Sequence, residues 1–280
     1  MNLKIENIES PGPQSKTVPL LDMMADHVVC RVPPQLRGKR FAMVSFGTCQ
    51  FYCPYCLTGG YLPRQDTYRF PNAVDVPIER IKSFIEAQAK LGNPIKFTGG
   101  EPILQGKILI ELVRLARSHG AYIVVDSNGA VPKFLIKLAS EIDQVALDIK
   151  GPPRYVERVA GASLDAAWSK PLAAAHALHH LGNITLEIRT PIFGFTTFDD
   201  LIEIASAIPE SAYWVIRRFL PAFEQNGVHA NRTDCLPWLI QPSKDQIEAY
   251  YEHLLNKFPQ LHGRLVSIMG NPVDADGVRF

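Results

Sequence analysis

The sequence predicts an α/β fold, a partial (β/α)6 barrel of the TIM type with parallel strands and outer helices. Six short apolar runs, rich in Val, Ile and aromatic residues, alternate with segments in which apolar residues recur every three or four positions. Such units in series give a parallel sheet whose right-handed crossovers place the helices on its outer face. Six units are too few for a closed eight-stranded barrel but suit an open one. A doubly wound Rossmann-like sheet is the alternative.

The predicted elements follow one another at even spacing. Strands are expected at residues 41–46, 94–98, 121–126, 144–150, 184–190 and 212–218. Helices are expected at residues 78–91, 106–118, 132–140, 164–181, 198–208 and 244–258. Pro132 suits a first helical turn, and Gly120 and Gly182 suit helix ends.

Two stretches lie outside this alternation. Residues 1–38 show no sustained period and contain five prolines, so we expect an irregular or partly helical leader packed on a main domain of residues 39–280. Residues 220–241, between the sixth strand and the last helix, contain Pro221 and Pro237 and are expected to form a loop or lid.

Composition excludes several classes of function. The 29 Lys and Arg residues nearly balance the 28 Asp and Glu residues, which argues against a general nucleic-acid binder. No apolar run approaches the roughly 18 residues of a membrane span, and residues 1–6 lack the apolar stretch of a secretory signal. We therefore expect a cytoplasmic protein in a reducing compartment, without a membrane partner.

Three of the five cysteines fall within eight residues, directly after the first predicted strand. Cys49, Cys53 and Cys56 can converge on one metal centre from a single loop. A zinc site would need a fourth ligand, and no second Cys-x-x-Cys or His pair follows nearby. A complete four-iron cluster normally uses four cysteines, so three suggest a [4Fe-4S] cluster with one iron open to a ligand outside the protein. The alternatives are unreactive buried cysteines or part of a zinc knuckle.

The remaining two cysteines, Cys30 and Cys235, are isolated in the sequence. Each is expected to be a small buried apolar residue.

Polar groups follow several predicted strands, at the edge where an α/β barrel places its active site. After the second strand come Gly99, Gly100 and Glu101, in which the glycines let the backbone approach a ligand closely. The later strand ends carry Asp126 and Asn128, then Asp148 and Lys150, then Arg189. For each group alone, a tight turn or a helix cap is the alternative interpretation.

The pattern Cys-x3-Cys-x2-Cys, with the aromatic Tyr55 before its last cysteine, resembles the signature of the radical S-adenosylmethionine (SAM) superfamily. The resemblance implies that SAM chelates the open iron and that Tyr55 belongs to the cofactor site. It also implies that Gly99, Gly100 and Glu101 hold the methionyl amino group of SAM. The chain has no ferredoxin-type cysteine insertion between Cys56 and Gly99, so one cluster is expected.

The later motifs resemble those of the glycyl-radical-enzyme activases, the group of pyruvate formate-lyase activating enzyme and the anaerobic ribonucleotide reductase activators. These motifs are Gly-Gly-Glu-Pro-x-x-Gln, Asp-x-Asn-Gly and Leu-Asp-Ile-Lys, and the similarity covers about residues 41–221. Leu220 departs from the activase pattern.

This resemblance implies roles for the polar strand ends. Asp126 and Asn128 would help to seat SAM, Asp148 and Lys150 would face the barrel mouth, and Arg189 would contact the SAM carboxylate or ribose. A guanidinium can form a bidentate pair with a carboxylate. The alternative for Arg189 is a salt bridge to Asp148 or Glu187.

The implied activity is that of an oxygen-sensitive radical SAM oxidoreductase. It would cleave SAM reductively to a 5′-deoxyadenosyl radical, take its electron from flavodoxin or ferredoxin, and activate a partner glycyl radical enzyme. Arg217 and Arg218, with the 220–241 region, would line a lateral opening for a large substrate. One alternative is a radical SAM enzyme acting on a small molecule, nucleotide precursor or peptide, as the carboxydeazaguanine synthases do. Another is a non-enzymatic zinc or iron–sulfur scaffold.

Overall fold

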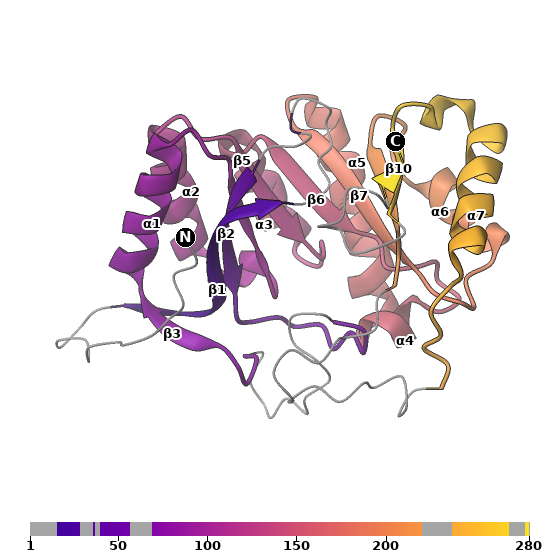
Figure 1. Ribbon diagram of the computed structural model, residues 1–280, viewed down its shortest axis with the longest axis horizontal. Helices are drawn as coiled ribbons and strands as arrows, with labels where there is room; N and C mark the ends of the chain where they lie inside the picture. The colour runs from indigo at the N-terminus through magenta and orange to yellow at the C-terminus, as the bar shows by residue number, and fades with distance from the viewer. Residues whose placement is uncertain are drawn as a thin grey trace.

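The computed structural model describes residues 16–28, 36, 40–56, 69–219, 237–268 and 278–279. These residues form one sheet in the order β10-β9-β8-β7-β6-β5-β4-β2-β1-β3 (Figure 1). The strands are β1 (Thr17–Val28), β2 (Arg40–Phe46), β3 (Val74–Pro77), β4 (Ile95–Gly99), β5 (Ile123–Ser127), β6 (Gln144–Asp148), β7 (Thr185–Ile192), β8 (Tyr213–Arg218), β9 (Leu265–Ile268) and β10 (Val278–Arg279). Neighbours from β2 through β4 to β9 pair in parallel, whereas β1, β3 and β10 join antiparallel.

All six strands expected from the apolar runs are present, as β2, β4, β5, β6, β7 and β8. Strand β6 lacks a polar alternation because a parallel strand is covered on both faces, whereas β4 and β7 place polar residues on alternate positions. In β6, for example, the consecutive residues Val145, Ala146 and Leu147 are all fully buried. The parallel pairing that we expected from the alternating pattern is confirmed.

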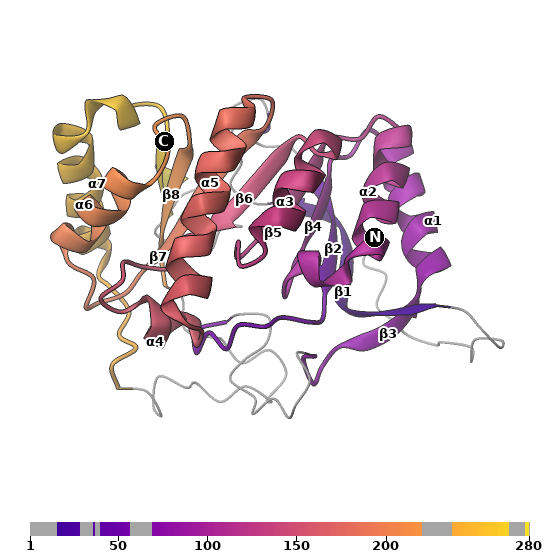
Figure 2. The same ribbon diagram turned by 180° about the vertical axis from the view of Figure 1, so that it is seen from behind.

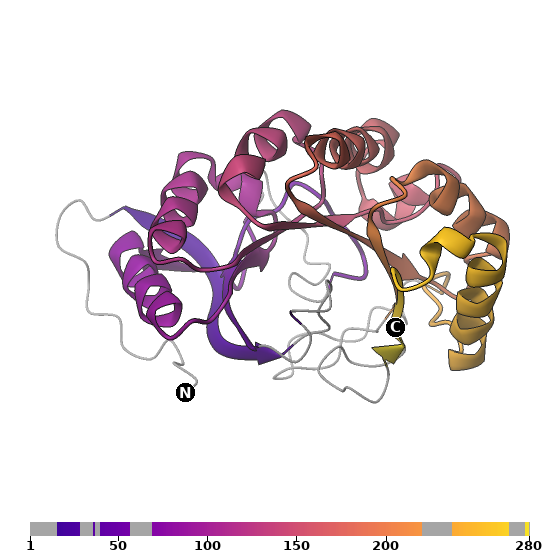
Figure 3. The same cartoon turned by 90° about the horizontal axis from the view of Figure 1, so that it is seen from above.

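The expected helices are also present and lie along the convex face of the curved sheet (Figures 2 and 3). They are α1 (Ile78–Lys90), α2 (Lys107–Ser118), α3 (Pro132–Leu138), α5 (Lys170–Leu181), α6 (Phe198–Ala207) and α7 (Lys244–Lys257). Each turns an apolar stripe inward; in α2 the stripe comprises Leu109, Leu112, Val113 and Ala116, all fully buried. Because these helices cover one face of the sheet, the fold is the open barrel and not the doubly wound alternative.

The helix ends follow the expected local rules. Pro132 occupies the first turn of α3, and Gly182 ends α5 in the left-handed conformation with φ +68°. The segment expected to be helical from Leu164 begins as a π-helical turn, η4 (Asp165–Ser169), before α5. The short 3-10 turns are η2 (Pro102–Gln105), η3 (Ala139–Glu141) and η5 (Pro259–Leu261).

The expectation of an irregular or partly helical leader is wrong for residues 17–28. This segment is β1, which lies between β2 and β3 and pairs with both. Val18 and Leu20 are fully buried, so the strand contributes to the core. Pro19 has no N–H to donate to a neighbouring strand, but its carbonyl accepts a hydrogen bond from the Gly47 N–H, at 2.8 Å.

Besides β1, four further elements were not expected: the short helix α4 (Val156–Ala160) and the strands β3, β9 and β10. Strand β9 extends the parallel sheet beyond β8. Cys30, Cys235, most of the leader and residues 220–236 lie outside the described residues. Within the described part of the chain, none of the helices has the length and apolar character needed to cross a bilayer.

Candidate functional site

A cavity of about 240 Å³ opens where the carboxyl ends of β2, β4, β5, β6, β7 and β8 converge. It is lined by Cys49, Cys53 and Cys56 and by every predicted cofactor-binding residue except Glu101. In a parallel barrel this edge collects the loops that follow the strands, which lets residues far apart in sequence share one site. The structure therefore brings together the cysteine loop and the later polar strand ends.

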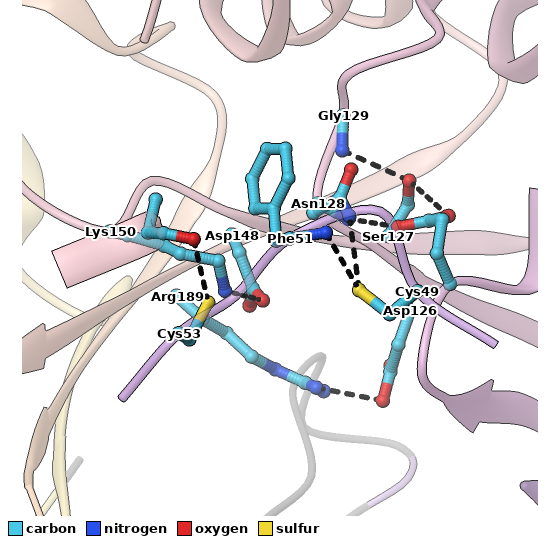
Figure 4. Close-up of polar contacts among 12 residues, drawn as sticks. Cys49, Phe51, Cys53, Asp126, Ser127, Asn128, Gly129, Asp148, Lys150 and Arg189 are labelled. Atoms are coloured by element: carbon cyan, nitrogen blue, oxygen red, sulfur yellow. Dashed lines mark hydrogen bonds and ion pairs between the residues drawn. The ribbon is translucent and has the colours of Figure 1, made fainter. Parts of the chain in front are cut away.

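The cysteine loop runs from β2 across the mouth of the cavity and rests on α4. The Tyr52 N–H donates to the Ala160 carbonyl at 3.1 Å, and the Cys53 thiol donates to the same oxygen at 3.5 Å (Figure 4). Cys49 and Cys53 are buried, whereas Cys56 is partly exposed. The carboxyl end of α4, which lacks intrahelical partners for its last carbonyls, thus holds the loop in place.

Two N–H groups point at the sulfur of Cys49. The Phe51 N–H lies 3.4 Å from Sγ, and the Asn128 side-chain amide lies 3.8 Å from it (Figure 4). Burial, together with the negative charges of Cys53 and Glu101, raises the pKa of the Cys49 thiol to about 12. A metal centre binds the thiolate, so its binding here would displace a proton.

Sulfur ligands that line one cavity and receive N–H donors fit an iron–sulfur cluster, whose potential depends on such hydrogen bonds. A single metal ion would need at least three side chains around one point. Among the described residues, no three Cys, His, Asp or Glu side chains are so arranged.

Gly99 and Gly100 allow β4 to end directly against the start of the cysteine loop. A Cβ on Gly99, which has φ +103°, would lie 2.4 Å from the Phe46 nitrogen. A Cβ on Gly100 would lie 2.0 Å from the Thr48 oxygen. The absence of side chains therefore serves close backbone packing, and both glycines still line the cavity.

Glu101 lies behind the cavity wall, where it joins the loop after β4 to the loop after β5. Its carboxylate accepts hydrogen bonds from the Asn128 N–H at 2.7 Å, the Ser127 hydroxyl at 3.0 Å and the Ile103 N–H at 3.2 Å. Burial raises its pKa to about 7, against the opposing effect of these hydrogen bonds. Glu101 thereby fixes the backbone of Asn128, whose side chain reaches Cys49.

Asp126 is the centre of a buried ionic network that crosses the inside of the sheet. Its Oδ2 atom accepts from the Thr98 hydroxyl at 2.7 Å, the Lys96 ammonium at 2.9 Å and the Arg189 guanidinium at 3.0 Å. Its Oδ1 atom is also buried but has no hydrogen-bond partner in the described part of the chain. Burial alone would raise the pKa of Asp126, but the charges of Arg189 and Lys96 hold it below the usual range, so the carboxylate is ionised.

Arg189 has the salt bridge that we considered as an alternative, although with one of the two expected partners. Its Nε atom donates to Glu187, two residues earlier on β7, and its Nη1 atom donates to Asp126. Asp148 instead pairs with Lys150, at 2.6 Å. Figure 4 shows the Arg189–Asp126 and Lys150–Asp148 pairs in the cavity wall.

Tyr55 forms an aromatic wall of the cavity. Its ring lies edge-on to Phe193 and Phe219, at centroid distances of 5.1 and 6.1 Å, and the Lys150 ammonium lies 5.9 Å from its centre. The Tyr55 hydroxyl is buried and unpartnered in the described part of the chain. Asp126 Oδ1 shares this state, and a buried polar atom without a partner in the protein calls for an explanation.

Sequence reasoning missed several residues of the site, notably Lys96, Thr98 and Ser127. A usable signal was present in β4, where Lys96 and Thr98 stand two residues apart in an apolar run. Residues two apart share one face of a strand, so polar groups there indicate a polar interior.

Comparison with known proteins bears on this site. The sequence model of the Radical SAM superfamily matches residues 43–208, which is more than half of the chain. A protein of Methanocaldococcus jannaschii, provisionally named as a glycyl-radical enzyme activating enzyme, is 25% identical over 187 residues, covering 65% of this chain and 74% of the relative. The 7-carboxy-7-deazaguanine synthase of the same organism is 26% identical over 182 residues, covering 62% of this chain and 72% of the relative.

Among solved structures, Streptococcus suis SuiB bound to its precursor peptide SuiA has a TM-score of 0.60 and 11% identity. The match covers 82% of this chain but only 48% of SuiB, so the chain spans about half the length of that protein. At this identity the likeness concerns the fold, and it confirms the partial barrel.

Proposed function

Because the chain belongs to the radical SAM superfamily, we propose that it binds a [4Fe-4S] cluster through Cys49, Cys53 and Cys56 and cleaves SAM reductively. The observation that supports this most directly is the convergence of the three cysteines and the polar strand ends on one cavity. Together, the bound cluster and SAM supply a 5′-deoxyadenosyl radical that removes a hydrogen atom from the substrate. The chain itself has to bind, orient and shield the reactants.

The geometry suggests how the chain seats the cluster and SAM. Asn128 and the Phe51 N–H would donate to the Cys49 thiolate, as they already do to its sulfur. The unpartnered Asp126 Oδ1 would accept from an ammonium or hydroxyl group of SAM. Lys150, held by Asp148, would meet the SAM carboxylate.

The other predicted cofactor residues have supporting roles in this proposal. Tyr55, Gly99 and Gly100 line the cavity, and Arg189 keeps Asp126 ionised. Glu101 acts through Asn128 and not by direct contact. Residues 39–280 form the catalytic unit, to which β1 adds a strand.

An electron donor is required, and we assign this role to a flavodoxin or ferredoxin. A cluster with an open iron is oxygen-sensitive, which is consistent with a reducing cytoplasmic location.

The substrate that we favour is a glycyl radical enzyme. The support comes from the activase-like motifs and from the relative named as an activating enzyme. The pyruvate formate-lyase-activating enzyme of Clostridium pasteurianum is also similar, at 26% identity over 115 residues. A small-molecule substrate is the second candidate, because Arg217 in the cavity has no counter-ion among the described residues and because deazaguanine synthases are equally similar.

Anaerobic reconstitution tests the proposed function. The protein is loaded with iron and sulfide, mixed with SAM and dithionite, and assayed for 5′-deoxyadenosine by chromatography. The wild type should form it, whereas Cys53→Ala should stay at background because one cluster ligand is missing. Equal product from both proteins, or none from a fully loaded wild type that binds SAM, would contradict the proposal.

A second arm identifies the substrate. A candidate glycyl radical enzyme is added, and its organic radical is sought by electron paramagnetic resonance. A radical signal that needs this chain and SAM supports the activase. Formation of 5′-deoxyadenosine without any such signal favours the small-molecule candidate.

A further inference from the structure

The cavity and the side chains that contact it contain an excess of positive charge. The cations are Lys96, Lys150, Arg189, Arg217 and Arg218, and the carboxylates are Glu101, Asp126, Asp148 and Glu187. Asp126 forms ion pairs with Lys96 and Arg189. Asp148 pairs with Lys150, and Glu187 pairs with Arg189. These pairings leave Arg217 and Arg218, both at the end of β8, without a carboxylate in the described part of the chain.

The two arginines differ in what their guanidinium groups contact. Arg218 donates from Nε to the Pro242 carbonyl at 2.7 Å, so it ties β8 to the segment before α7. Both arginines line the cavity, but the described residues offer the Arg217 guanidinium no hydrogen-bond acceptor or counter-ion. Its place on β8 puts it on the same strand face as Val215, which packs on the inner side against Val266 and Ile268.

This environment is unfavourable for Arg217 as it stands. Burial and the positive charge of Arg189 lower the pKa of Arg217 from its usual value, although the carboxylates of Asp148 and Asp126 act in the opposite direction. Guanidinium stays charged in proteins, so the unmet need is for an anion and not for loss of a proton. Arg217 is partly buried, and a guanidinium removed from part of its water without a partner is costly; an oxyanion is the partner that its planar donors fit best.

Two occupants could meet this need, the carboxylate of SAM or an anionic group of the substrate. The cysteine loop follows β2, and Lys150 follows β6, whereas Arg217 lies on β8, beyond β7 from that lysine in the sheet order. Lys150 is already directed toward Tyr55 beside the cysteine loop. Lys150 therefore offers the SAM carboxylate a cation nearer to the cysteines than Arg217. Arg217 remains available for a second molecule.

We propose that Arg217 binds an oxyanion group, carboxylate or phosphate, of the substrate from which hydrogen is removed. The inference rests on the proposed SAM cleavage and names a property of the substrate. It makes Arg217 a specificity-determining residue, and Arg218 a structural neighbour that fixes the β8 end.

Calorimetric titration tests this assignment on iron-loaded protein saturated with SAM, so that the cofactor's own anion site is filled. Inorganic phosphate and malonate are the two probes, at constant ionic strength. The variants are Arg217→Gln, Arg217→Lys and the control Arg114→Gln. Arg114 is an exposed arginine of α2 that pairs with Glu141. The SAM affinity of each protein is measured in parallel.

We expect the wild type and Arg114→Gln to bind at least one probe alike. Arg217→Gln should bind it at least about 10-fold more weakly, because a charged hydrogen bond is lost, and Arg217→Lys should recover part of the affinity. The SAM affinity of Arg217→Gln should stay within about threefold. A preference for phosphate or for malonate then tells which oxyanion the substrate carries.

Three results would overturn the assignment: a wild type that binds neither probe, equal probe binding by Arg217→Gln, or a loss of SAM affinity of about 10-fold or more in that variant. The last result would make Arg217 a cofactor ligand. Failure of the proposed function is recognised separately, because it is a wild type that forms no 5′-deoxyadenosine. A wild type that forms it but ignores both probes refutes only the role of Arg217.

Discussion

The two carboxylate oxygens of Asp126 have opposite environments. Oδ2 receives three donors, from Lys96, Thr98 and Arg189, while the buried Oδ1 receives none from the described residues. The charge is therefore stabilised at one atom while the other stays available. A carboxylate arranged in this way can bind a cationic or hydroxyl group without first releasing another partner.

Replacing Asp126 with Asn should destabilise the protein by about 3–5 kcal/mol, because it leaves Lys96 and Arg189 buried with less compensation. The pKa of Asp126 is lowered in the folded state, so its stabilising effect is present above the unfolded pKa of about 4 and is lost as pH falls below it. Urea unfolding from pH 7 to pH 3 measures both effects. The difference in the free energy of unfolding between the wild type and Asp126→Asn should become smaller below about pH 4. Equal urea midpoints of the two proteins at pH 7 would contradict this stabilising role of Asp126.

At the scale of elements, α4 and the cysteine loop form one unit. Gly161 ends α4 at φ +57°, and a Cβ there would lie 2.6 Å from the Tyr52 carbonyl oxygen. The neighbouring Ala160 carbonyl receives the Tyr52 N–H and the Cys53 thiol. The close approach of α4 thus determines where the second cysteine lies.

Gly161→Ala should therefore impair cluster binding more than folding. Gly182→Ala is a matched control, because Gly182 has φ +68° but open space where its Cβ would lie. Both variants should lose about 1 kcal/mol from left-handed backbone strain. We expect only Gly161→Ala to lose more than about half of its iron after reconstitution, since only it displaces the loop. Iron content and thermal unfolding measure the two effects, and equal iron in both variants would refute the coupling.

At the scale of the whole molecule, the sheet is curved (Figure 3), and its middle strands have paired neighbours on both sides, unlike the strands at its edges. Strands β5, β6 and β7 each pair on both sides and lie beneath the outer helices. Among the described strands, β3 pairs with β1 alone, and β10 pairs with β9 over two residues. The cavity lies at the ends of the well-supported strands.

Hydrogen exchange should follow this gradient. Amides in β6 should exchange at least about 100-fold more slowly than amides in β3, because opening an edge strand breaks fewer contacts. Mass spectrometry of peptic fragments measures the difference. Equal protection of the two strands would show that the sheet opens as a single unit.

The sequence was sufficient for six of the parallel strands but not for the parallel strand β9 or for the first strand, β1. A buried parallel strand can be a continuous apolar run, so β6 can be predicted from its own residues without knowledge of the neighbouring strands. In β1 the register shifts between Leu20 and Asp22 and again between Met24 and His27, which destroys the alternation expected of an antiparallel strand. Pro19 adds a signal against a strand, and only the pairing with β2 and β3 outweighs it.

In the site, too, contacts between residues near in sequence could be predicted, whereas contacts between different strands could not. The salt bridge of Arg189 with Glu187 is local, since residues two apart share a strand face, and it was foreseen as an alternative. The contact with Asp126 depends on sheet order and curvature, because the two strands are separated by β6. Glu101 was expected to hold the SAM amino group; the structure places its carboxylate on Asn128, Ser127 and Ile103, which a sequence does not reveal.

The ionic network also constrains how such a chain can evolve. Lys96, Asp126, Arg189 and Glu187 come from three strands, yet each one neutralises another inside the barrel. A single substitution leaves an unmatched buried charge, whereas removing the whole set in favour of apolar residues need not destabilise the fold. Diverging descendants should therefore keep the set intact or exchange it by compensated changes, and intermediates with one member altered should be rare.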